Sequence, residues 1–162
     1  MTSLPTVVRR HFTPMLAMAR DILEHCPEQV LMQPHLDVRE HLYHALVGLD
    51  VWLSPHPMAY PFDAIVDDDA AQLKRHGPAS DRITRQYLLD YVDRLEAKVA
   101  TLPEDADAFL TDHEIQGRSF TLLDRCLGQL RHVQHHLGVV NEKLRRQHVE
   151  VAAWVGYGEG ED

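Results

Sequence analysis

The stretch Arg131–Arg146, RHVQHHLGVVNEKLRR, decides the fold of this chain. Its apolar residues recur every three or four positions, which is typical of one face of an α-helix. The same spacing continues toward the N-terminus, so the sequence predicts a helix that Ser119 opens and that runs through Gln147. Such a helix is on the order of 40 Å long. Its apolar stripe comprises Leu123, Cys126, Leu127, Leu130, Val133, Leu137, Val140 and Leu144.

Three other segments have the same helical periodicity. They are Pro14–Cys26, Asp37–Leu53 and Asp81–Leu102. Their expected N-caps are Thr13, Asp37 (with Glu40 three residues later, as a variant of the capping box) and Ser80. Residues 4–11 are expected to add a helical turn or two before the first segment, bent at Pro14.

No segment shows the sustained period-2 alternation of a strand, so the four helices predict an all-α domain. The connection over residues 54–79 is rich in Pro, Asp and His, and it is far longer than the usual connection of about 4–6 residues. We therefore expect a four-helix bundle with a long crossover between the second and third helices. Residues 1–162 are expected to form this single domain, with residues 155–162 as a flexible tail.

The charge balance excludes several classes of partner. Sixteen Lys and Arg against 25 Asp and Glu give a formal charge of −9, which repels nucleic acid and anionic membrane surfaces. No stretch approaches the roughly 18–20 apolar residues of a membrane span, and the first residues lack the apolar region of a signal peptide. We therefore expect a cytoplasmic protein. Cys26 and Cys126 are too few and too far apart for a disulfide framework and are expected to be reduced thiols.

The chain has 12 histidines, and two of them have metal-ligand spacing. His132 and His136 are four residues apart on the long helix, so their imidazoles lie one above the other on one face with about 5–6 Å between the Cβ atoms. Two imidazoles in this arrangement can share one metal ion. His135 points in another direction, and solvated surface is the alternative interpretation of such a pair.

A third ligand is expected on the second helix, where His41 and His44 both lie off the main apolar stripe. We prefer His44 because Gly48, one turn later, leaves room for a metal ion and its exchangeable ligand, and His41 is the reserve. Three imidazoles leave coordination positions of Zn²⁺, Ni²⁺, Fe²⁺ or Mn²⁺ open to water or substrate. That arrangement is typical of a reactive rather than a structural site.

The two histidine-bearing segments, HLYHALVGLDVWL (His41–Leu53) and RHVQHHLGVVNEKLR (Arg131–Arg145), resemble the DinB-like family of damage-inducible four-helix metal proteins. That family includes bacterial transferases that act on the thiols bacillithiol or mycothiol. The resemblance implies a divalent ion, often Zn²⁺ or Ni²⁺, held by His44, His132 and His136. Members often have Arg-Gly-Gln after the last ligand, where this chain has Leu137, Gly138 and Val139.

Two functions remain open at this stage. The first is a metal-dependent thiol S-transferase or hydrolase that acts on a small-molecule substrate, with a low-molecular-weight thiol as a possible second cofactor. The second is a non-catalytic metal-binding stress-response bundle. The family resemblance and the apolar segment Val149–Val155 also predict a homodimer, unless that segment packs on its own chain.

Overall fold

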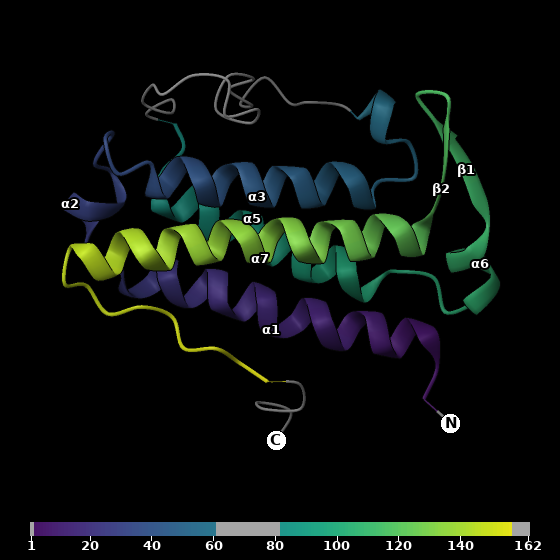
Figure 1. Ribbon diagram of the computed structural model, residues 1–162, viewed down its shortest axis with the longest axis horizontal. Helices are drawn as coiled ribbons and strands as arrows, with labels where there is room; N and C mark the ends of the chain where they lie inside the picture. Colours follow the sequence, from purple (N-terminus) through teal and green to yellow (C-terminus); the bar gives the residue numbers. More distant parts are fainter. Residues whose placement is uncertain (1, 61–81, 157–162) are drawn as a thin grey trace.

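The computed structural model describes residues 2–60 and 82–156 and shows a mostly helical protein (Figure 1). The long helices are α1 (Leu4–His25), α3 (Val38–Leu53), α5 (Arg85–Ala100) and α7 (Leu122–Arg146). The short ones are α2 (Glu28–Leu31), α6 (Ala106–Leu110) and the 3₁₀ turn η1 (Pro57–Ala59). The strands β1 (Asp112–Ile115) and β2 (Arg118–Thr121) form one small hairpin. The all-α prediction is therefore confirmed for the described residues, apart from this hairpin.

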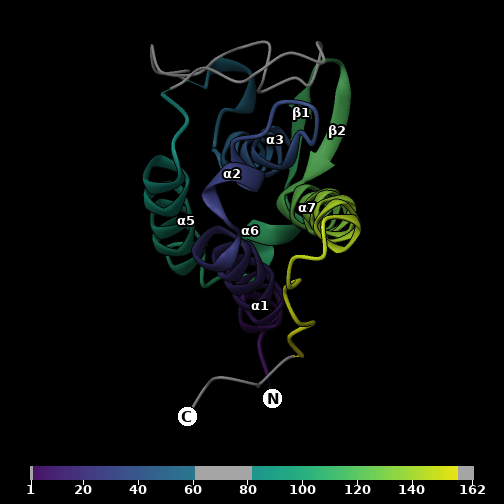
Figure 2. The ribbon, with the colours of Figure 1, turned by 90° about the vertical axis from the view of Figure 1, so that its left-hand side faces the viewer.

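The four long helices lie side by side around one apolar core, as the end-on view in Figure 2 shows. Helix α3 packs against α7 and α5, and α1 packs against α5 and α7. Fully buried residues on each helix include Phe12, Leu49, Leu88 and Val140. The four-helix bundle with a long crossover remains a prediction, because residues 61–81 of the connection lie outside the described residues. Within the described ranges, no helix combines the length and apolarity needed to cross a membrane.

The helical turns predicted over residues 4–11 are confirmed, but the predicted cap at Thr13 is wrong. Ser3 is the N-cap, its hydroxyl accepts from the Thr6 amide at 3.3 Å, and α1 runs without a break to His25. Pro14 therefore lies inside the helix. Proline removes one backbone hydrogen bond, but Phe12 and Met15 on either side are completely buried. Their packing outweighs the local cost of the proline.

The caps of the next two long helices differ from prediction to different degrees. Asp37 is the N-cap of α3, as predicted, but it has left-handed backbone angles (φ 52°, ψ 24°) and its side chain makes no capping hydrogen bond. The third long helix is capped by Thr84, whose hydroxyl accepts from the Tyr87 amide at 3.1 Å, and it ends at Ala100 rather than Leu102. Ser80, the predicted cap, lies outside the described residues.

The hairpin replaces the predicted start of the last helix. Ser119 lies in β2, and the two-residue turn between the strands is Gln116–Gly117, both with positive φ. Positive φ at both positions is the geometry of the type I′ turn that suits a two-residue hairpin. Helix α7 instead begins after Thr121, which forms a capping box with Asp124. The Thr121 hydroxyl accepts from the Asp124 amide, and the Asp124 carboxylate accepts from the Thr121 amide at 2.9 Å.

The segment after α7 turns back onto its own chain. Ala152 is buried, its carbonyl accepts a hydrogen bond from Asn141, and Val149, Val151 and Val155 pack against the core. Of the two predictions for this segment, packing on a partner or on its own chain, the structure has the second. Trp154 is nevertheless 70% exposed. Val155 belongs to this packed segment rather than to a free tail, and residues 157–162 lie outside the described residues. The homodimer stays a prediction.

Candidate metal centre

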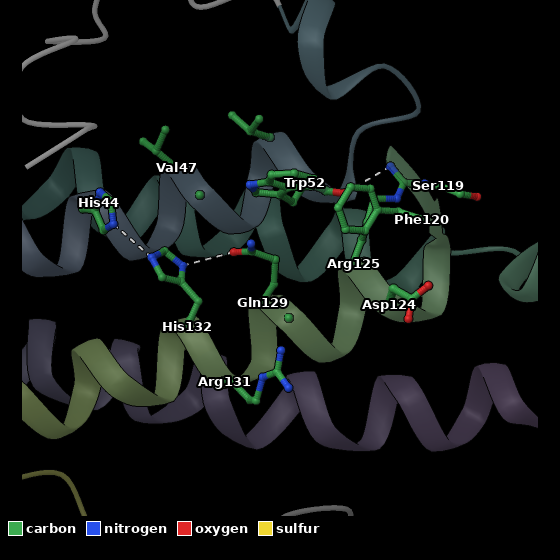
Figure 3. A pocket seen from close by; sticks show the side chains of 13 residues that line it. His44, Val47, Trp52, Ser119, Phe120, Asp124, Arg125, Gln129, Arg131 and His132 are labelled. Carbon is green, nitrogen blue, oxygen red and sulfur yellow. Dashed lines mark hydrogen bonds between the residues drawn. The ribbon is translucent and has the colours of Figure 1, made fainter. Parts of the chain in front are cut away.

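Helices α3 and α7 bring three histidines together where they pack along each other. His44 comes from α3, and His132 and His136 come from consecutive turns of α7. The Nε2 atom of His132 lies 2.9 Å from that of His44 and 3.2 Å from that of His136. One nitrogen of each ring lies within 4.8 Å of the others, and Figure 3 shows His44 and His132 facing each other. The residues predicted as ligands therefore do form one cluster.

The spacing of these nitrogens fits a single divalent ion. Two nitrogens bound to one tetrahedral Zn²⁺ at about 2.0–2.1 Å are separated by about 3.3–3.4 Å. The separations of 2.9 and 3.2 Å need only a shift of a few tenths of an ångström to reach that value. Among the described residues, no Cys, Asp or Glu joins the cluster. The donor set is therefore three imidazoles, which suits Zn²⁺, Ni²⁺, Fe²⁺ or Mn²⁺.

Gln129 fixes the tautomer of His132. The side-chain Oε1 of Gln129 lies 3.1 Å from Nδ1 of His132. An amide oxygen can only accept, so Nδ1 carries the proton and Nε2 keeps its lone pair. That lone pair faces the centre of the cluster. Such an outer partner is typical of metal-binding histidines, in which the hydrogen bond of the second nitrogen orients the first.

His41 occupies the corresponding outer position behind His136. The Nδ1 atoms of the two rings lie 2.9 Å apart, so one of them carries the shared proton. If His136 donates, its Nε2 keeps a lone pair directed at His132 and His44, as a ligand requires. His41 lies outside the group of three convergent nitrogens. The geometry thus favours His44 as the third ligand and gives the reserve candidate a supporting contact.

The surroundings of the cluster keep His132 and His136 neutral. His136 is buried, and burial together with the neighbouring His44 and His132 lowers its pKa to about 3. Burial and His44 lower the pKa of His132 to about 4. Burial, followed by the charge of Lys143, lowers the pKa of His41. Neutral imidazole is the form that binds metal ions. At pH 7, His132 and His136 can therefore bind an ion without first releasing a proton.

Gly48 is required by the site, but not for the reason predicted from the sequence. A Cβ atom at Gly48 would lie 2.8 Å from Cε1 of His132 and 3.2 Å from its Nδ1. Both distances are shorter than carbon and nitrogen atoms tolerate without a shift. The glycine therefore makes room for the His132 ring itself, rather than for an exchangeable ligand of the metal.

A pocket of about 860 Å³ adjoins the cluster and runs between α3 and α7 toward the hairpin. His44 and His132 line its histidine end, as Figure 3 shows. The rings of Trp52 and Phe120 meet edge to face, with centroids 6.0 Å apart, at its other end. Other lining residues include Val47, Val51, Arg125 and Gln129. No pattern in the sequence predicted this pocket.

Other histidines lie away from the cluster. His135 is exposed on α7, as its predicted direction implied, and His35 and His56 are exposed beyond the two ends of α3. Comparison of the chain with protein-family models, with curated proteins and with solved structures found no match. The chemistry of this site is therefore the basis on which a function can be proposed.

Proposed function

We propose that this protein is a metal-dependent enzyme of the transferase or hydrolase type, with one divalent ion held by His44, His132 and His136. The convergence of three imidazoles supports the ion, and the donor set accepts Zn²⁺ or Ni²⁺. The resemblance of the two histidine-bearing segments to the DinB-like family supports thiol S-transfer as the chemistry. It also favours the bundle with a long crossover as the complete fold.

The single observation that carries an enzymatic role is the pocket beside the ligands. Structural zinc sites are closed by four protein ligands, whereas catalytic sites keep a position open. Here His44 and His132 line a pocket of about 860 Å³, and among the described residues no fourth protein donor joins the cluster. A small molecule in the pocket would therefore meet the ion on the side that the histidines leave open.

The residues around the cluster have separable roles. When bound, the ion would act as a Lewis acid that lowers the pKa of a coordinated water or thiol. Gln129 and His41 hold the rings of His132 and His136 in the ligand orientation. Trp52 and Phe120 provide an apolar wall that excludes water and binds the hydrocarbon part of a substrate.

The proposal is tested with protein purified without a histidine tag and loaded with Co²⁺, whose visible spectrum reports its ligands. Titration with a low-molecular-weight thiol should produce a sulfur-to-cobalt charge-transfer band that saturates at about one thiol per ion. The same titration of His136→Ala, which lacks a ligand, should give no such saturable band. A wild-type spectrum that thiols leave unchanged would contradict the enzymatic proposal and favour a closed, non-catalytic metal site.

A further inference from the structure

We infer that Arg125 is an anion-binding residue at the far end of the same pocket, and that the substrate is an elongated molecule with an apolar body and a terminal carboxylate. The inference rests on the proposed function for the reacting end of that substrate. The site at Arg125 is argued from separate observations and is tested without a metal ion.

Arg125 is a buried cation without a counter-ion. Its side chain is only 6% exposed, and its Nη1 donates to the backbone carbonyls of Trp52 and Ser54 at 3.2 and 2.8 Å. Its Nε is buried and has no acceptor. None of the ion pairs among the described residues involves Arg125. Its guanidinium therefore has no described carboxylate within ion-pair distance.

Other arginines of this chain show that the situation is unusual. Arg39, which is even less exposed, has the carboxylate of Glu40 at 3.2 Å. The partly buried Arg9 and Arg20 also pair with carboxylates, at 2.7 Å each. A buried charge is costly unless it is paired and hydrogen-bonded. The missing partner of Arg125 is therefore the kind of group that a ligand supplies.

The surroundings of Arg125 favour an anion that enters through the pocket. The acidic residue next to it, Asp124, directs its carboxylate to the N-cap Thr121, and in Figure 3 it points away from Trp52. The other charged side chain that lines the pocket is Arg131, which is exposed and also positive. The first turn of α7 adds the positive end of the helix dipole. Among the described residues, Asp124 is the acidic group that lines this pocket, and its carboxylate is held at Thr121 rather than at the guanidinium.

The remaining donor of Arg125 suits a carboxylate oxygen. Nη1 is occupied by the two carbonyls at the end of α3 and Nε is buried, so Nη2 is the nitrogen left to donate to a ligand. A hydrogen bond from a guanidinium to a carboxylate is about twice as strong as one between neutral groups. The aromatic wall of Trp52 and Phe120 beside it suits a flat or extended apolar group.

The helix sets the distance between the two ends of such a substrate. Arg125, Gln129, His132 and His136 follow one another at intervals of four, three and four residues and so share one face of α7. Seven residues separate Arg125 from His132, which corresponds to about 10.5 Å along the axis. A carboxylate held at Arg125 would therefore place a group roughly 10 Å away beside the metal ligands.

The test uses tryptophan fluorescence. The chain has two tryptophans, of which Trp52 lines the pocket and Trp154 is exposed outside it. In a Trp154→Phe background, Trp52 alone reports binding. The probes are 4-phenylbutanoate and its neutral analogue 4-phenylbutanamide, titrated into protein freed of metal with a chelator, so that the carboxylate cannot bind an ion instead.

We expect the metal-free protein to bind the carboxylate at least about tenfold more tightly than the amide, as a charge-assisted hydrogen bond implies. Arg125→Met should remove this preference, whereas Arg145→Met, which changes an exposed arginine of the same helix outside the pocket, should keep it within about twofold, since exposed charges are screened. Equal affinity of the unmutated pocket for the two probes, or a preference that persists in Arg125→Met, would overturn the inference.

Three further outcomes are each decisive, and the last two separate the inference from the proposed function. If Arg125→Met fails to fold, as circular dichroism would show, the comparison of the two probes in the parent protein still decides the matter. If the carboxylate preference is present but thiols do not reach a bound ion, the proposed function fails while the Arg125 site stands. If the preference is absent while thiols bind the ion, only the Arg125 site is overturned.

Discussion

The Nδ1 atoms of His41 and His136 lie 2.9 Å apart, across the interface between α3 and α7. This contact gives His136 a hydrogen-bond partner on the side away from the other two histidines. Gln129 does the same for His132 at 3.1 Å. Two of the three proposed ligands are therefore oriented by a second residue, as expected of a metal site rather than of histidines gathered by chance.

Replacing His41 should weaken metal binding without abolishing it. We expect His41→Ala to bind Zn²⁺ about 10–100-fold more weakly, which is the usual effect of removing a hydrogen-bond partner of a ligand. His44→Ala should lose stoichiometric binding altogether. Competition with a chromophoric chelator measures both affinities. If His41→Ala lost the metal and His44→Ala retained it, the third ligand would be His41.

Adding one methyl group at Gly48 should damage the site. Because the new Cβ would lie 2.8 Å from the His132 ring, we expect Gly48→Ala to move that ring and lower Zn²⁺ affinity at least about tenfold. Gly128→Ala is the matched control, since Gly128 lies across the same pocket on α7 and a Cβ there meets nothing within 4 Å.

The Gly128 control should be stabilising. Alanine in a helix is favoured over glycine by about 0.8–1 kcal/mol, which corresponds to a melting temperature about 2–4 °C higher for a chain of this size. Differential scanning calorimetry measures the melting temperature of Gly128→Ala. Competition with a chromophoric chelator measures the zinc affinity of both variants. Equal zinc affinity in Gly48→Ala and Gly128→Ala would show that the close approach of Gly48 to His132 has no role in the site.

The metal-free protein should lose stability as the pH falls below about 6.5. The folded-state pKa values of His132 and His136, about 4 and about 3, lie below the ordinary value of 6.5. Between those values the unfolded chain binds more protons, so acid favours unfolding. The free energy of unfolding should decrease by at most about 1.4 kcal/mol per pH unit for each imidazole.

Urea unfolding at several pH values between 7 and 4.5 measures this slope. His136→Asn should show a smaller dependence on pH, because it lacks one of the depressed groups. His135→Ala, an exposed neighbour on the same helix, should keep the slope of the parent protein. If His136→Asn kept the same pH dependence as the parent protein, the pKa of His136 would not be depressed in the folded chain.

Some features of this site follow from one helix alone and could be predicted. The pairing of His132 with His136 depends only on the 3.6-residue repeat of α7. The position of His44 as a ligand depends on the register of α3 against α7. Gly48 indicated the correct face of α3, although its role is to make room for the His132 ring. The outer contact of His41 and the carbonyl contacts of Arg125 depend on that same register, so no local pattern indicates them.

The sequence did not predict the hairpin for a different reason. Its strands have only four residues each, and their exposed faces give no clear alternation. The turn Gln116–Gly117 lacks the Asn or Asp that makes a type I′ turn recognisable. The pattern Thr121–Asp124, three residues apart, was nevertheless a visible capping-box signal for the start of α7.

Removal of the metal should leave the fold intact. The four long helices share a buried apolar core that does not include the histidine cluster. We therefore expect a chelator to preserve the helical circular dichroism at room temperature, and saturating Zn²⁺ to raise the melting temperature. Metal at about 100 times its Kd adds about 2.7 kcal/mol to the free energy of unfolding. Loss of the helical signal with a chelator would instead identify the ion as structural.

The central claim, a divalent ion held by His44, His132 and His136, is tested most directly by the metal content of tag-free protein after equilibration with Zn²⁺ and gel filtration. We predict about one zinc ion per chain for the parent protein and for His135→Ala, and a content near zero for His136→Ala. Full zinc occupancy in both variants, or none in the parent protein, would contradict the assignment.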